Sequence, residues 1–301
     1  MFGSHLSIAG GLHHALIEAH RLDMDCVQVF TKNQRQWRVP PLKNEQVNDW
    51  NATRKETGID AVVSHDSYLI NLASGNSETR KKSIGLFREE LLRCEALTIP
   101  YLVTHPGAHL GDGEDEGLKR VADALDELHC ELPGLKVVTC LEVTAGQGTS
   151  LGYKFEHLRM IIDSVAQPER LGVCLDTAHL LAAGYDLTSA RGCRGVIDEL
   201  DDVIGLQRVK AIHMNDSKVE RGKRVDRHAH IGKGHVSLDA FREIVRHKTL
   251  RQLPKILETP KDDLPDGTPW DTVNLNVLRQ LQSSRKLPRK SPRKSSPKNN
   301  A

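Results

Sequence analysis

The chain has 301 residues, of which 38% are hydrophobic, 27% are charged and only 4% are aromatic, and its formal net charge is +2. No apolar stretch approaches the roughly 20 residues that a membrane-spanning helix needs, and the first residues lack the basic and apolar regions of a secretory signal. The six cysteines form no C-x-x-C pair. The composition excludes a membrane protein and a small disulfide-linked protein, and we expect reduced thiols in a cytosolic compartment.

Short β-branched segments alternate with longer amphipathic segments along most of the chain. Strands are predicted at 2–6, 26–31, 61–65, 101–105, 137–142, 172–176, 209–214 and 255–258. Helices are predicted at 11–22, 44–57, 78–97, 114–129, 155–165, 192–203, 238–245 and 272–282. Eight such pairs predict a closed (β/α)8 TIM barrel. An open doubly wound sheet is the alternative, but SIAGGLHHA after the first strand lacks the G-x-G-x-x-G fingerprint.

The chain ends in a basic segment of different composition. Residues 284–301, SRKLPRKSPRKSSPKNNA, hold seven Lys and Arg and no acid, so 35 basic and 40 acidic residues remain in 1–283. We therefore expect one barrel domain over 1–283 and a disordered tail over 284–301. The tail is either a solubilising terminus or an arm that contacts phosphates, and a nuclear or other targeting signal is a third alternative.

Seven of the eight predicted strands end in a histidine or a carboxylate. These residues are His5, His65, His105, Glu142, Asp176, His213 and Glu258. In a parallel barrel all these ends open on one face, where active sites lie. Because unpaired buried charge is costly, converging imidazoles and carboxylates need a partner, and a metal cluster supplies one.

Two further pairs fit the same centre. Asp176 and His179 are three residues apart, so one helical turn places both on one side. Asp226 and His228 are two residues apart, so an extended loop directs both the same way. Spacing alone does not choose between His228 and His230.

Spacing also leaves a choice between His105 and His109 in THPGAH. A donor set of His and carboxylate without Cys fits zinc, with manganese or iron as substitutes. Nine groups are too many for one ion, and three ions with a bridging carboxylate would use them all. Three dications against four carboxylates leave a positive centre that attracts phosphate and activates water, which predicts phosphodiester hydrolysis.

Several long motifs resemble a known family. FTKNQRQW, SHDSYLINLA, THPGAH, LEVTAGQGTSLGYKFEHL, LDTAHLLAAGYD, HMNDSK, RVDRHAHIGKG and LET are similar, in order and spacing, to the endonuclease IV family of apurinic/apyrimidinic endonucleases. The resemblance implies a monomeric barrel with three zinc ions, in the cytoplasm and on the nucleoid if bacterial. The implied reaction cuts double-stranded DNA 5′ of an abasic site, leaving a 3′-hydroxyl and a 5′-deoxyribose phosphate, and also cleans blocked 3′ ends.

The resemblance also implies a role for each motif residue. It assigns His65 and His105 to one ion, with Glu142 bridging to a second. It assigns Asp176, His213 and Glu258 to the second ion, together with Glu142. It assigns His179, Asp226 and His228 to the third ion. It thus favours His105 over His109 and His228 over His230. Glu258 and Glu142 are the expected catalytic residues, and Glu258 is expected to orient or deprotonate the attacking water.

To recognise a missing base, the abasic sugar must leave the stack, and a side-chain wedge can hold the resulting gap open. The resemblance implies that Arg35, Tyr68 and Leu69 form the wedge. Without it, Arg35 would be interpreted as a solvated cation and Tyr68 as a core or rim residue. Weaker candidates for contact with the DNA backbone are Asn33, Gln36 and Lys154.

Three positions need separate comment. Val143 and Lys233 depart from the family pattern, which commonly has Asn and an acidic residue there. Val143 removes a polar group that could touch a ligand or DNA, and Lys233 adds a cation that favours DNA. His5 matches a family histidine that is not a ligand, and we expect it to contact a ligand instead.

Two other functions compete with the nuclease. A metal-dependent sugar isomerase on a related barrel shares strand-end ligands, but it has no use for the Asp226 and His228 pair or for FTKNQRQW. A non-catalytic binder of damaged DNA would be indicated by the loss of a ligand, and all nine are present.

Deletion of residues 284–301 tests the arm. If the tail contacts phosphates, the truncated protein should bind duplex DNA more weakly and with a flatter salt dependence, because each lost contact removes about 0.9 from the log–log slope. Anisotropy titrations at several salt concentrations measure the slope. An unchanged slope would exclude the arm and favour the solubilising terminus.

Overall fold

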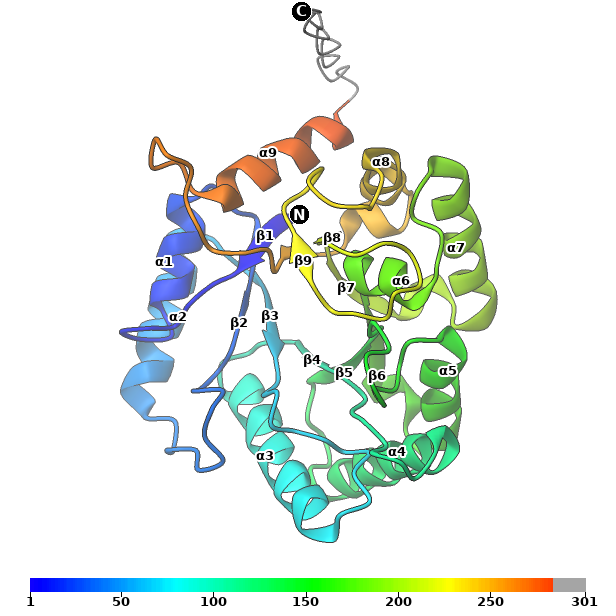
Figure 1. The fold of residues 1–301 in the computed structure, drawn as a ribbon. Helices are drawn as coiled ribbons and strands as arrows, with labels where there is room; N and C mark the ends of the chain where they lie inside the picture. The colour runs from blue at the N-terminus through cyan, green and yellow to red at the C-terminus, as the bar shows by residue number, and fades with distance from the viewer. Residues whose placement is uncertain (284–301) are drawn as a thin grey trace, which may run out of the picture.

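The computed structural model describes residues 1–283, and the predicted disordered tail lies outside them. Eight parallel strands close into a barrel in the order β1-β10-β7-β6-β5-β4-β3-β2, and helices surround it (Figure 1). The predicted TIM barrel is confirmed. The barrel strands are β1 (Phe2–His5), β2 (Cys26–Val29), β3 (Ala61–His65), β4 (Tyr101–Thr104), β5 (Val138–Glu142), β6 (Leu171–Asp176), β7 (Val209–His213) and β10 (Lys255–Leu257).

The helices fall close to their predicted positions. They are α1 (His14–Arg21), α2 (Asn44–Thr57), α3 (Ser77–Ala96), α4 (Glu114–Glu131), α5 (Phe155–Ser164), α6 (Thr177–Ala183), α7 (Ala190–Val203), α8 (Leu238–Arg246) and α9 (Trp270–Gln282). Short 3-10 turns at Pro168–Arg170, Leu206–Arg208 and Leu250–Gln252 precede β6, β7 and β10. None of the helices within 1–283 combines the length and apolarity needed to cross a membrane.

Some boundaries differ from the prediction. Helix α1 begins three residues later than expected, because Gly11, the first residue of the predicted helix, takes a positive φ of 150° that a helix does not allow. Strands β4 and β10 each end one residue early, so His105 and Glu258 lie just past them. The turn expected after Asp176 is a longer helix, α6, whose first turn is capped by the Asp176 carboxylate accepting from the His179 N–H at 2.8 Å.

Alternation of side chains along the strands separates two layers inside the barrel. The lower layer is apolar and fully buried, and it comprises Val63, Val103, Cys140, Cys174 and Ala211. Two residues further along the same strands stand the predicted ligands, such as His65 after Val63 and Glu142 after Cys140. Because side chains alternate with period two, the apolar floor and the polar mouth follow from the same strand geometry.

A small hairpin carries the last two predicted ligands. Strand β8 (Asp216–Ser217) pairs antiparallel with β9 (His228–Ala229), so the loop between them bears Asp226. The Asp216 carboxylate is fully buried, and burial raises its pKa. It accepts four backbone N–H groups at 2.8 to 2.9 Å, from Ser217, Gly232, Gly234 and Val236. This carboxylate therefore holds the hairpin and the following loop together.

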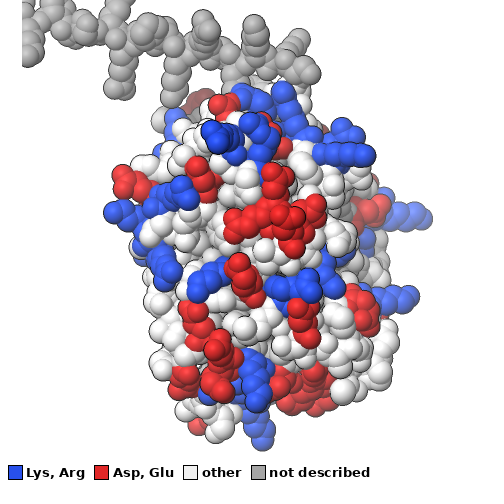
Figure 2. Space-filling view, turned by 90° about the vertical axis from the view of Figure 1, so that its right-hand side faces the viewer, with Lys and Arg blue, Asp and Glu red and all other residues white. Residues whose placement is uncertain are grey.

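The side of the barrel on which α5 and α7 lie carries charges of both signs, without a large patch of either. Figure 2 shows the side on which α5 and α7 lie, where basic and acidic side chains are interspersed. Such a surface gives weak, non-directional attraction for a polyanion.

Replacement of the Asp216 carboxylate should loosen the hairpin. Asp216→Ala leaves buried N–H donors without an acceptor and should lower the free energy of unfolding by about 3 kcal/mol. Asp49→Ala, at an exposed position of α2, is the control and should change it by less than ~0.5 kcal/mol. Urea unfolding measures both, and equal midpoints for the two variants would contradict the role of Asp216.

Candidate metal centre and DNA-binding face

The barrel mouth brings eight of the nine predicted ligands into three groups. Within each group the donor atoms lie within 4.8 Å of one another. The groups are His65, His105 and Glu142; Glu142, Asp176, His213 and Glu258; and Asp176, His179 and His228. Glu142 and Asp176 each belong to two groups, so these carboxylates join the three into one cluster.

Glu142 lies at the centre of the cluster and is fully buried. Its Oε2 atom is 3.1 Å from His65 Nε2 and 3.3 Å from His105 Nε2. Its Oε1 atom is 3.0 Å from His213 Nδ1 and 3.1 Å from His179 Nδ1. The two oxygens thus face different pairs of imidazoles, as a bridging carboxylate requires.

Asp226, the ninth predicted ligand, lies beside the third group. Its Oδ1 atom is 3.2 Å from His179 Nε2 and 3.3 Å from His228 Nε2. The Asp226 backbone N–H donates to Gln147 Oε1 at 3.0 Å, which ties the hairpin loop to the loop after β5. The side chain of Asp226 is 43% exposed, so the third group is the one most open to solvent.

Backbone carbonyls orient three of the imidazoles. In each, Nδ1–H donates to a carbonyl oxygen, which leaves the Nε2 lone pair directed at the cluster. The pairs are His65 with Asp66 at 3.0 Å, His179 with Val143 at 3.0 Å, and His228 with Glu258 at 3.2 Å.

The cluster shifts the pKa values of its members. Burial alone would raise the pKa of Glu142, but the charges of His213 and His105 outweigh burial and hold it well below its ordinary value. At Asp226 burial would also raise the pKa, but the neighbouring imidazoles of His179 and His228 outweigh it, and the pKa falls to about 2. The carboxylates of Glu142 and Asp226 are therefore ionised, which is the form that binds a cation.

These residues fit a metal cluster. Among the described residues, His179 Nε2 and His228 Nε2 are buried without a hydrogen-bond partner, although buried nitrogens are rarely left unpaired. Both atoms point toward the Asp226 carboxylate. A cation between them would satisfy all three groups, and the set of imidazole and carboxylate donors is that of a metal-binding site.

Sequence reasoning missed two amides in the cluster. Gln28 is fully buried in β2 and lies between His213 and Glu258. Asn215 donates from Nδ2 to Asp176 Oδ2 at 2.7 Å and accepts the Glu258 N–H at 2.7 Å. For Gln28, the sequence signal that could have found it was a single amide inside the apolar strand CVQV. His5 lies as expected beside a ligand, with Nδ1 3.4 Å from Glu258 Oε1.

The candidate DNA-binding residues occupy two adjacent loops at the mouth. Arg35, Asn33 and Gln36 are exposed on the loop after β2. The Asn33 Oδ1 atom accepts the Arg35 N–H at 2.9 Å, which shapes the loop tip. The Ser67 hydroxyl donates to the Gln34 carbonyl at 3.0 Å, so this loop and the loop after β3 are joined.

Tyr68 stands between two clefts that both open on the cluster. It is 70% exposed, and its ring centroid is 5.9 Å from that of His65. A cleft of about 360 Å³ on one side also touches His105 and His179, and one of about 490 Å³ on the other touches His228 and Glu258. An exposed aromatic ring at this place is suited to stacking on DNA.

Two other candidate DNA-binding residues, Leu69 and Lys154, are less accessible to a DNA strand. Leu69 is half-buried and packs against the core. The Lys154 ammonium is 3.2 Å from Glu114 Oε2 and is already paired.

Of the two departures from the family pattern, Val143 is fully buried, and its carbonyl orients His179. Lys233 is exposed, with Nζ 5.8 Å from the centre of the Trp270 ring.

A buried ion pair anchors the loop after β2. Lys32 Nζ is 3.0 Å from Glu90 Oε1 on α3, and both side chains are almost fully buried. The Thr31 hydroxyl donates to the other Glu90 oxygen at 2.7 Å, and Arg93 donates to the Pro40 carbonyl at 3.2 Å. Lys32 is therefore a structural cation that anchors this loop.

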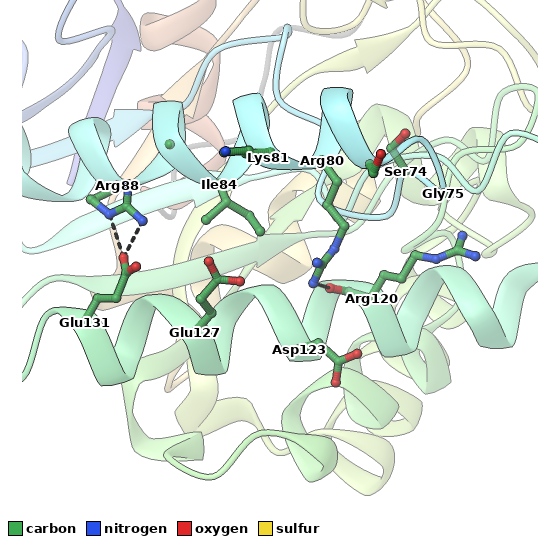
Figure 3. A pocket seen from close by; sticks show the side chains of 12 residues that line it. Ser74, Gly75, Arg80, Lys81, Ile84, Arg88, Arg120, Asp123, Glu127 and Glu131 are labelled. Carbon is green, nitrogen blue, oxygen red and sulfur yellow. Dashed lines mark hydrogen bonds and ion pairs between the residues drawn. The ribbon is translucent and has the colours of Figure 1, made fainter.

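A larger cavity, of about 740 Å³, lies outside the barrel between α3 and α4 (Figure 3). Its walls carry opposite charges, and Arg88 donates to Glu131 at 2.6 Å across it. None of the metal-capable groups found among residues 1–283 includes a residue of this cavity. Donor chemistry, and not size, therefore places the functional site at the barrel mouth.

Comparison with known proteins first identifies the class of protein to which this chain belongs. Residues 16–281 match the family described as xylose isomerase-like TIM barrel. A protein of Chloroflexus aurantiacus named "Probable endonuclease 4" is 48% identical over 281 residues, which are 93% of this chain and 97% of the relative. D-psicose 3-epimerase from Clostridium cellulolyticum H10 has a TM-score of 0.68 at 14% identity, covering 93% of this chain and 99% of the epimerase. This last likeness shows a shared fold alone.

A solved structure completes the comparison. Endonuclease IV from Thermus thermophilus superposes with a TM-score of 0.80 at 34% identity, covering 93% of this chain and 98% of that structure. The chain belongs to the endonuclease IV family of apurinic/apyrimidinic endonucleases, which are DNA-repair enzymes.

Proposed function

We propose that the chain hydrolyses the phosphodiester 5′ of an abasic site in double-stranded DNA, using three zinc ions held by the nine side chains at the barrel mouth. The products are a 3′-hydroxyl and a 5′-deoxyribose phosphate, and the same chemistry removes blocking groups from 3′ ends. The observation that carries the proposal is the triple grouping of donors, in which Glu142 and Asp176 are shared. Manganese or iron could replace zinc, since imidazole and carboxylate also suit them.

The three groups of donors support the ligand assignment that the family resemblance implies. In this assignment His65, His105 and Glu142 would hold the first ion, and Glu142 would also be a ligand of the second. The second and third sites take the remaining donors: Asp176, His213 and Glu258 for the second, and His179, Asp226 and His228 for the third. Zinc bound at these positions would polarise the phosphate and lower the pKa of a bound water.

Glu258 and Glu142 carry the catalytic roles. Glu258 lines the cleft of about 490 Å³ and its side chain is 15% exposed, so a water in the cleft can reach its carboxylate. Glu258 orients this water and accepts its proton. The water oxygen bonds to phosphorus while the bond from phosphorus to the 3′-oxygen breaks, and Glu142 holds the imidazoles around the reacting group.

The loops after β2 and β3 recognise the missing base. Tyr68 and Arg35, with Leu69 behind them, form the wedge that fills the gap left by the abasic nucleotide. Asn33 and Gln36 contact the DNA backbone from the same loop. An abasic nucleotide leaves the stack at a lower cost than a paired one, which favours damaged over intact duplex. We expect a monomer that acts in the cytoplasm, on the nucleoid in a bacterium.

Incision of a labelled duplex with one abasic-site analogue tests the function. Zinc-loaded wild type should make a single cut 5′ of the lesion and leave the undamaged duplex intact. His228→Ala should lose metal and activity together, because the third group loses a donor. Glu258→Gln should lower turnover by orders of magnitude while abasic DNA still binds.

The alternatives predict other results in the same assay. A wild-type protein that holds about three ions and makes no cut would contradict the nuclease. Turnover of a sugar substrate would then support the isomerase, and selective binding of abasic duplex without a cut would support the damage binder. Near-normal turnover by metal-replete Glu258→Gln would remove its catalytic role.

Removal of the Tyr68 ring tests the wedge. Tyr68→Ala should weaken binding to abasic duplex roughly ten-fold or more, since stacking of one base contributes about 1–3 kcal/mol. Binding to undamaged duplex should change less, because an intact stack offers no gap. Anisotropy titrations on both duplexes, with Trp37→Ala as an exposed aromatic control from the neighbouring loop, measure the difference. Equal losses on the two duplexes would exclude a wedge.

A further inference from the structure

Gln28 is the only one of the described barrel residues whose side-chain amide bonds both His213 and Glu258. Its Oε1 atom is 2.8 Å from His213 Nε2. Its Nε2 atom is 2.6 Å from Glu258 Oε1 and 2.9 Å from His5 Nδ1. All three partners lie at the barrel mouth, and Gln28 itself has no exposed surface.

The chemistry of the partners fixes the orientation of this amide. An ionised Glu258 carboxylate can only accept, so the amide nitrogen of Gln28 must face it. The second N–H of that nitrogen then donates to His5 Nδ1. The amide oxygen is left to face His213, and it can only accept, so His213 must donate from Nε2.

This constraint sets which nitrogen of His213 can bind a cation. With the proton on Nε2, a neutral His213 has its lone pair on Nδ1. That atom is 3.0 Å from Glu142 Oε1 and 3.2 Å from Glu258 Oε2. In this neutral tautomer three acceptors face one another where the second group of donors meets, and a metal cation among them would satisfy all three.

His213 differs from three other histidines of the cluster in what orients it. His65, His179 and His228 are oriented by backbone carbonyls and present Nε2. The position of a backbone carbonyl is set by the fold whatever the side chain, whereas a side-chain amide is present only if the residue at that position is Gln or Asn. The orientation of His213 therefore depends on a residue that no ligand motif includes.

We propose that Gln28 is a positioning residue for the second ion, holding His213 in the tautomer that presents Nδ1 and holding Glu258 so that Oε2 faces the same point. The inference rests on the proposed zinc centre. Gln28 touches neither DNA nor the phosphate in this arrangement. It acts through the two ligands that it joins.

Gln28→Met tests the role, because methionine keeps the length of the side chain and removes all three hydrogen bonds, to His213, Glu258 and His5. The variant should bind one of its three zinc ions 10- to 100-fold more weakly, the range found when partners of metal ligands are removed. Competition with a zinc chelator measures each affinity. Turnover on abasic duplex should fall at limiting zinc, with KM for DNA nearly unchanged because the wedge loops are untouched.

A spectroscopic readout separates positioning from folding. In the zinc-loaded wild type, the ¹⁵N shifts of His213 should show a protonated Nε2 and a metal-bound Nδ1, and this pattern should be lost in Gln28→Met. Cys140→Ala is the matched control, since it truncates a fully buried side chain in the apolar layer below. It should lower thermal stability while all three zinc affinities and the His213 shifts stay as in wild type.

Each outcome is decisive. Wild-type zinc affinities and an unchanged His213 tautomer in Gln28→Met would overturn the inference while leaving the nuclease intact. An equal loss of all three ions in Gln28→Met and in Cys140→Ala would show a general effect of the core, and would also overturn it. A wild type that holds no zinc and makes no cut would instead contradict the proposed function itself.

Discussion

The rest of the site depends on the burial of one carboxylate among imidazoles. Glu142 has no exposed surface, and its two oxygens face four histidine nitrogens at 3.0 to 3.3 Å. A charge at such a place is costly unless positive partners surround it. Only a closed barrel supplies partners from every side, because its strands converge at one end. The small side chains beneath the cluster, Cys140 and Ala211 among them, leave room for this convergence.

Elements outside the strands then determine what the centre can act on. The hairpin held by Asp216 adds the exposed Asp226 to a buried set of donors, which opens the third group to a substrate. The ion pair of Lys32 with Glu90 anchors the loop that carries Arg35. Both devices are buried polar contacts that hold loops of the barrel mouth in place.

The fold by itself does not separate this chain from sugar epimerases, which share its barrel at low identity. The distinction lies in the donor set and in the loops. Sharing of Glu142 and Asp176 among three groups goes beyond what one or two ions need. Function thus belongs to the site that the barrel carries, and not to the barrel.

The amino-acid sequence by itself determined the barrel and most of the centre. Period-two strands ending in His, Asp or Glu were enough, because parallel strands in a closed barrel must bring their ends to one face. Motif resemblance then chose His105 and His228 over their neighbours, and those two histidines lie in the cluster.

Only the tertiary structure decided the contacts between residues distant in the chain. Gln28 and His213 are bonded across 185 positions, and Lys32 is paired with Glu90 on another element. A lone amide in an apolar strand, or a lysine in a basic motif, has no partner until the chain folds. The sequence therefore determines which donors reach the mouth, whereas the packing of strands and loops decides which nitrogen each imidazole presents.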